Sequence, residues 1–210
     1  MRVIQPISSR FRPAVFAVGL VALAVPAIAA DTPQRVRGTV VGIEGNVLTV
    51  KSREGANVAI TLANGWSANG VVAAKLSDIK AGDFVGVASV PTKDKVDDLE
   101  ALELVIFPEA MRGTGEGHYS WDLAAGSTMT NATVATKVDS VKGETLTLSY
   151  KGGERKINVP QATPIVTFAP ATPADVTAGA VVFVPAQKKD DGSLGATRVL
   201  VGKNGVVPPM

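Results

Sequence analysis

Side chains suited to binding a metal are concentrated in one segment, Pro108 to Asn131 of a 210-residue chain. This segment holds the only histidine and two of the four methionines. Imidazole nitrogen suits copper or zinc, and thioether sulfur suits monovalent copper. The candidate metal ligands are His118, Met111, Met129 and Glu116, and copper or zinc is the only cofactor that the sequence suggests. The alternative is that His118 is an exposed, solvated side chain, because a lone histidine lacks the usual partner ligands.

Three aromatic side chains are candidates for ligand binding. Tyr119 and Trp121 lie in the same segment, where a simple linker would have no aromatic residues. They could bind a ligand, or they could pack between two domains and fix their angle. Trp66 lies in ANGWSANG, where it could stack on a sugar ring or a base, or close the end of a barrel core.

Catalytic motifs have little support in this chain. It has no cysteine, one histidine and no Gly-x-Ser-x-Gly motif, which disfavours thiol, multi-histidine metal and hydrolase chemistry. Pairs of carboxylates that could act in glycoside hydrolysis can be drawn from any chain with 19 acids, so they indicate little. No glycine-rich phosphate motif precedes a helix. The sequence therefore predicts a protein that is not an enzyme.

The first 29 residues have the layout of a signal peptide, with a basic start, an apolar stretch and a small-x-small cleavage site. The chain carries 21 Lys and Arg against 19 Asp and Glu. Three arginines and no acid lie in the leader, so residues 30–210 hold 18 basic and 19 acidic side chains. We expect a periplasmic protein with no integral membrane span in the mature chain. The near-neutral charge of residues 30–210 argues against nucleic acid as a partner.

Short β-like runs separated by Gly, Asn and Asp fill the rest of the chain. In the first half, Leu48 and Val50 follow a Gly45-Asn46 turn, and one short helical turn is expected between the third and fourth of five strands. The order returns about 97 residues later, with Leu146 aligned with Leu48. Repetition in one order indicates tandem copies of one module. The predicted divisions are 1–29 signal peptide, 30–107 first β-domain, 108–131 connector and 132–210 second β-domain.

Five short strands with one helical turn are typical of the OB-fold, so we expect an all-β protein of two tandem, five-stranded OB-like barrels. A β-sandwich is the alternative, because strand count and spacing do not separate the two. The opening Gly38-Thr39-Val40 to Leu48-Thr49-Val50 and the pattern L-x-D-[IV]-x-x-G resemble a bacterial exported OB-like family of unknown function. That resemblance implies a fold and a compartment, and no mechanism.

The function expected from these features is a periplasmic, non-enzymatic binding or assembly module. It would act through a surface that binds a protein, a peptide or a small ligand, because an OB-like barrel exposes strand edges and a binding face. The alternative is a copper- or zinc-binding protein that uses the connector around His118.

Overall fold

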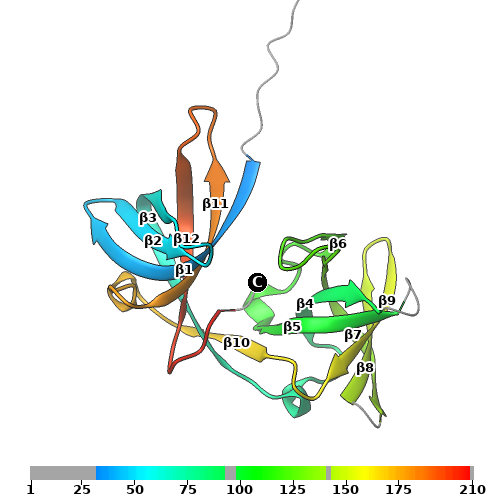
Figure 1. The fold of residues 1–210 in the computed structure, drawn as a ribbon. Helices are drawn as coiled ribbons and strands as arrows, with labels where there is room; N and C mark the ends of the chain where they lie inside the picture. The colour runs from blue at the N-terminus through cyan, green and yellow to red at the C-terminus, as the bar shows by residue number, and fades with distance from the viewer. Residues whose placement is uncertain (1–31, 93–97, 141–142, 209–210) are drawn as a thin grey trace, which may run out of the picture. The chain divides into compact units, whose positions relative to one another are not determined.

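The computed structural model describes residues 32–92, 98–140 and 143–208, and the predicted signal peptide lies outside them. The expectation of an all-β protein is confirmed, since these residues form strands and only short 3₁₀ turns (Figure 1). The strands are β1 (Thr32–Glu44), β2 (Val47–Ser52), β3 (Asn57–Ala73), β4 (Phe84–Pro91), β5 (Leu99–Phe107), β6 (Gly117–Ser120), β7 (Thr128–Ser140), β8 (Gly143–Tyr150), β9 (Gly153–Pro160), β10 (Ile165–Pro170), β11 (Val181–Lys188) and β12 (Leu194–Gly202). The 3₁₀ turns are η1 (Leu76–Asp78), η2 (Glu109–Met111) and η3 (Pro173–Asp175). Within the described residues, no helix is long and apolar enough to span a bilayer.

Five strands close the first ring, in the order β1-β2-β3-β12-β11 and back to β1. All neighbours are antiparallel except β3 and β12, which are parallel. Alternation places Leu48 and Val50 of β2 inside the ring with no exposed surface, as period-2 patterning predicts. The ring is filled by small β-branched and aliphatic side chains that form one buried cluster.

A second ring has the same connectivity, in the order β7-β8-β9-β5-β4 and back to β7. Here β9 and β5 are the parallel neighbours. Leu146 and Leu148 of β8 are fully buried inside it, in the positions that Leu48 and Val50 occupy in the first ring. Each five-stranded ring is closed, as in a barrel rather than a sandwich.

The two rings exchange their last two strands. β4 and β5 follow β3 in the chain, yet they complete the second ring. β11 and β12 follow β10, yet they complete the first. The strands within 30–107 therefore contribute to both rings, and so do those within 132–210. The segments that leave each ring pair antiparallel with each other, with Thr167 of β10 opposite Val72 of β3.

The turns before β4 and β11 share one local structure, which uses an Asp and a Gly at corresponding positions in the two halves. Asp78 Oδ2 accepts a hydrogen bond from the Lys75 N–H at 2.8 Å, and Asp175 Oδ2 accepts one from Thr172 N–H at 2.7 Å. These carboxylates cap η1 and η3. Gly82 and Gly179 have φ of +92° and +85°, a region that favours glycine. The predicted short helical turn is thus a single 3₁₀ turn in each half.

Candidate functional site

A cavity of about 260 Å³ is lined by residues from both rings and from the connector, residues 108–131. We call it the aromatic cavity. Its walls are Pro33, Gln34, Arg35, Asn69, Phe107, Met111, Thr114, Gly115, Tyr119, Trp121, Asn131, Phe168, Phe183, Pro185, Ala186, Gln187, Arg198 and Leu200. Mostly apolar walls with a few polar groups are typical of small-molecule sites.

Phenylalanine side chains form the apolar wall. The Phe107 ring lies 5.4 Å from the Phe84 ring and 5.5 Å from the Phe168 ring, in tilted geometry. Phe183 of β11 belongs to the same buried cluster. The chain has six phenylalanines, and these four are all of those beyond residue 29. Packed aromatic rings hold this wall in place because each is fixed by its neighbours.

The connector forms the opposite wall and is held on the second ring by β6, which pairs with β7. Asn131 of β7 donates from Nδ2 to the Tyr119 hydroxyl at 3.2 Å and to the Thr114 carbonyl at 3.1 Å. Burial raises the pKa of Tyr119, against the opposing charge of Arg35, so the phenol stays neutral. The Tyr119 ring meets the Trp121 ring edge-on, 6.0 Å between centroids.

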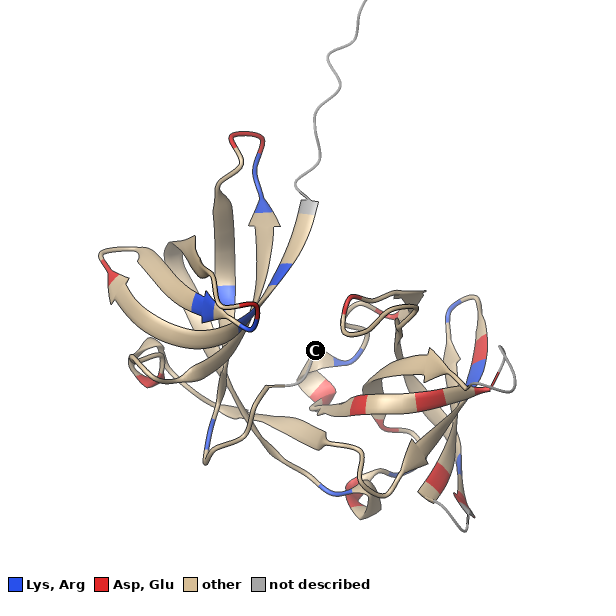
Figure 2. Cartoon of the chain, in the orientation of Figure 1, with Lys and Arg blue, Asp and Glu red and all other residues tan. Residues whose placement is uncertain are grey.

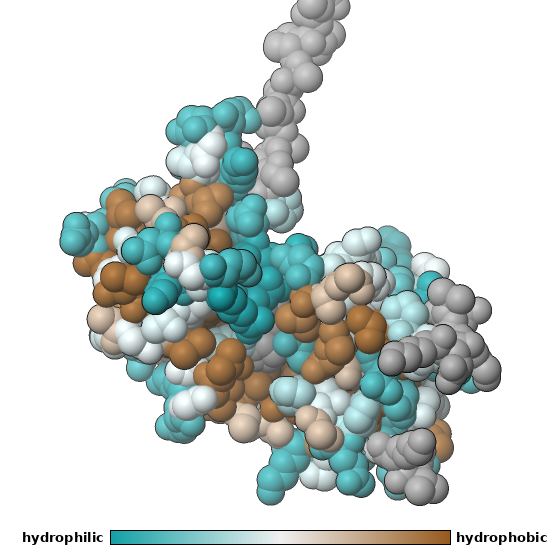
Figure 3. Space-filling model, in the orientation of Figure 1, coloured by the Kyte–Doolittle hydropathy of each residue, from teal (hydrophilic) through white to brown (hydrophobic). Residues whose placement is uncertain are grey.

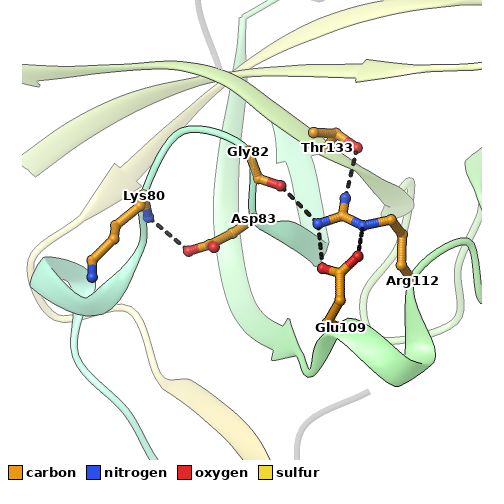
Figure 4. Close-up of polar contacts among 6 residues, drawn as sticks. All are labelled: Lys80, Gly82, Asp83, Glu109, Arg112 and Thr133. Carbon is orange, nitrogen blue, oxygen red and sulfur yellow. Dashed lines mark hydrogen bonds and ion pairs between the residues drawn. The ribbon is translucent and has the colours of Figure 1, made fainter.

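A second anchor holds η2 of the connector on the second ring (Figure 4). Arg112 donates to both carboxylate oxygens of Glu109 at 2.6 Å and to the Gly82 carbonyl at 2.9 Å. The hydrogen bond from Arg112 lowers the pKa of Glu109, and the same bond raises the pKa of Arg112. Met111 lies between these two residues in sequence, so the ion pair positions its side chain in the cavity wall.

The connector also contacts β1 of the first ring through Asp122 and Trp121. Asp122 Oδ1 lies 2.8 Å from Arg37 Nη2, and Asp122 Oδ2 lies 3.7 Å from Arg35 Nη1. Burial raises the pKa of Asp122, but the Arg37 hydrogen bond and the charges of both arginines outweigh it, so the pKa is lowered. The Arg35 guanidinium lies 3.8 Å from the centroid of the Trp121 ring, a cation–π contact. Figure 2 shows the basic segments of β1 in blue.

Two buried polar atoms in these walls lack a hydrogen bond from any described residue: Trp121 Nε1, a donor, and Asn131 Oδ1, an acceptor. Buried polar groups in native proteins are nearly always satisfied. Their hydrogen-bonding capacity distinguishes this wall from an ordinary apolar core.

Three of the predicted site residues, Met111, Tyr119 and Trp121, line the aromatic cavity together. The third ligand-binding candidate, Trp66, is not among the lining residues. It packs against the core of the first ring and is partly buried, which fits the barrel-closing alternative.

Two of the candidate metal ligands, His118 and Met129, lie on opposite faces of one strand pair. On the β6–β7 pair, His118 faces Thr130 and Tyr119 faces Met129, so His118 and Met129 point to opposite faces. His118 Nδ1 lies 2.8 Å from Thr130 Oγ1, and burial together with the charge of Arg155 lowers the pKa of the imidazole. Glu116 accepts a hydrogen bond from Lys151 N–H at 2.9 Å. Among the described residues, no group of three or more His, Cys, Asp and Glu could hold a metal ion.

Comparison of the chain with protein-family models, curated proteins and solved structures finds no match. The resemblance to an exported OB-like family stays a prediction from the sequence. Any function must therefore be argued from the aromatic cavity itself.

Most residues of this site were not predicted from the sequence. Phe107, Phe168 and Phe183 were not among the candidate residues, and neither was Arg198. One signal was present: beyond the leader, phenylalanine is confined to four positions, each at or beside a β-like run. These phenylalanines are far apart in the sequence, so they can be recognised as one cluster only when the pairing of their strands is known.

Proposed function

We propose that this chain is an exported, periplasmic, non-enzymatic protein that binds a small apolar molecule in the aromatic cavity. The supporting observation is the cavity itself, about 260 Å³ between a wall of packed phenylalanines and an anchored aromatic connector. An engineered apolar cavity of about 150 Å³ is enough to bind benzene. The aromatic cavity has room for a benzene ring with a short side chain.

The chemistry of the lining supports binding rather than catalysis. None of the residues around the cavity is an Asp, Glu, His, Lys, Ser or Cys. General acid–base and nucleophilic catalysis most often use such groups, placed within hydrogen-bond reach of the substrate. The only hydroxyls are those of Thr114, which donates to the Met111 carbonyl at 2.7 Å, and Tyr119.

Few large apolar side chains are exposed on the described residues. Large apolar side chains exposed on the described residues are Val41, Tyr119, Val138 and Val207. On the face shown in Figure 3, hydrophobic residues (brown) form several separate groups with hydrophilic residues (teal) and intermediate ones (white) between them. A broad apolar patch is the usual mark of a stable protein interface, so the cavity is the better-supported site.

The proposal is tested by titrating residues 30–210 with 3-phenylpropanol, a neutral probe of suitable size, while recording tryptophan emission. Trp66→Phe leaves Trp121, in the cavity wall, as the reporter. We expect a saturable change in emission. Asn69→Phe, which places a large side chain in the cavity, should abolish it.

Asn64→Phe is the matched control, because Asn64 lies on the same strand, is exposed and does not line the cavity. It should leave the titration unchanged. A linear, non-saturating response, or equal responses in the two variants, would contradict the proposal.

A further inference from the structure

The charged groups in the walls of the aromatic cavity are both arginines, Arg35 and Arg198, and no carboxylate lines it. Cations at the edge of an otherwise apolar site favour an anionic group on whatever binds there. The cavity thus has a charge preference as well as an apolar character. The arginine that binds this anion should be the one whose guanidinium is not already held by other groups of the protein.

Arg35 is engaged by the protein. Its guanidinium lies 3.8 Å from the centroid of the Trp121 ring, and its Nη1 lies 3.7 Å from Asp122 Oδ2. Both contacts belong to the connector and hold it against β1. A ligand that took Arg35 would have to compete with them.

Arg198 of β12 is exposed, and no hydrogen bond, ion pair or ring contact to it is found within the described part of the chain. Its five N–H donors are therefore available, and their planar arrangement matches a carboxylate with two parallel hydrogen bonds. Acidic side chains do not compete for it in the cavity, since none lines the walls.

A second hollow adjoins the cavity at this residue. It shares Pro185, Gln187 and Arg198 with the aromatic cavity, has a volume of about 400 Å³, and is also free of lining carboxylates. Lys189 lies on the wall of this second hollow. The pKa of nearby Asp191 is lowered, mainly by a hydrogen bond with Ser193 and to a smaller extent by the charge of Lys189. The charge of Lys189 is thus partly balanced by Asp191. Arg198 lines both hollows.

We propose that the ligand is an apolar carboxylate, with its ring or chain in the aromatic cavity and its carboxylate bound by Arg198. This inference rests on the proposed function and names the chemical class of its ligand. The size of the cavity limits the apolar part to about one aromatic ring with a short chain. The bound carboxylate would project toward the second hollow, where the positive charge continues.

Two probes that differ only at the end group test the inference: 3-phenylpropionate and 3-phenylpropanol, measured by isothermal titration calorimetry with residues 30–210. A charge-assisted hydrogen bond from Arg198 should make the carboxylate bind about tenfold more tightly than the alcohol. The difference should shrink at high salt, because the contact is at an exposed edge.

Arg198→Gln should remove this preference and leave the affinity for the alcohol unchanged. Arg155→Gln is the matched control, since Arg155 is exposed on β9 and does not line the cavity. It should preserve the tenfold preference.

The outcomes separate the two proposals. Equal binding of both probes to the unmodified chain would overturn the carboxylate assignment and leave the cavity a binding site. A preference that survives Arg198→Gln would overturn the role of Arg198. Failure of both probes to bind would overturn the proposed function itself.

Discussion

The two rings have the same strand order but differ at the seam where the third strand meets the fifth. In the first ring, β12 pairs with β3 from Gly195 opposite Thr61 to Gly202 opposite Val71. In the second ring, β5 pairs with β9 through Leu99 opposite Ile157 and Glu100 opposite Asn158, and the seam then continues on β10, from Leu104 opposite Ile165 to Ile106 opposite Thr167. The seam is thus formed by one continuous strand, β3, in the first ring and by two separate strands, β9 and β10, in the second.

Proline explains the difference. β3 runs without a break from Asn57 to Ala73 and contains no proline, whereas the matching stretch of the second repeat has Pro160 and Pro164. Proline has no N–H to give to a ladder and is excluded from the interior of a sheet. β9 therefore ends at Pro160, and β10 begins as a separate strand that pairs with β3 and β5. The two prolines therefore account for the break that divides the second seam between β9 and β10.

The largest expected effect tests whether the unequal rings still unfold together. Leu48→Ala and Leu146→Ala remove equivalent, fully buried side chains from the first and second rings. Each should cost about 2–5 kcal/mol of unfolding free energy, because a cavity remains in a packed core. Since the rings exchange strands, we expect either variant to shift one shared transition in urea.

Tryptophan emission measures this directly, with Trp66 reporting on the first ring and Trp121 on the connector. Single-tryptophan variants should give coincident midpoints. Two separate transitions, each moved by only one of the leucine substitutions, would show that the rings are independent.

An intermediate effect concerns the seams themselves. Amide hydrogen exchange should be slower along the seam of the first ring, around Thr61 to Val71, than at Ile157 and Asn158 of the second. Local opening needs less free energy where fewer ladder bonds must break, so a difference of about 10- to 100-fold is expected. Equal protection at the two seams would show that closure of the second ring does not depend on its ladder.

The smallest expected effect concerns the contact between the connector and β1. The pKa of Asp122 is lowered in the folded protein, so its contribution to stability is present above the unfolded pKa of about 3.9 and is lost as pH falls through the folded value. Because the carboxylate is partly exposed, the loss should be about 0.5 kcal/mol. Trp121 emission should shift in that acidic range.

Asp122→Asn should produce the same emission shift at neutral pH and remove its acid dependence. Glu154→Gln, an exposed carboxylate on β9 that lies outside the cavity, should change neither. An acid shift that persists in Asp122→Asn would assign the titration to another group.

The sequence was informative about strands and turns because those depend on neighbouring residues. Alternation placed Leu48, Leu146 and their partners inside, and the Asp and Gly positions marked the turns that Asp78 and Asp175 cap. The sequence did not predict which strands pair with each other. The two halves have strands with similar apolar faces and therefore similar edges. By their local sequence, β4 and β11 could each pair within either ring, so the local sequence does not specify which ring each strand joins.

The same limit applies to the cavity. The composition of the connector pointed to Tyr119 and Trp121, which lie two residues apart. Phe107 and Phe183 meet in one cluster across 76 residues, and only the exchanged strands bring them there. Arg198 had no local feature to separate it from other exposed arginines. Its position at the edge of the cavity follows from the pairing of β12 with β3 and β11.

The exchange of strands also sets an order of events during synthesis. The first ring contains the earliest strand, β1, and the latest, β12, so it cannot close until Leu194–Gly202 has been made. The second ring needs nothing beyond β9 and can form earlier. Contacts between such distant residues slow folding, because a long loop must close first. A chain halted after β10 would hold one complete ring and the paired strands β1, β2 and β3, in which β1 and β3 would each lack one neighbour. Addition of the final hairpin, β11 and β12, then closes the first ring and completes the wall of the cavity.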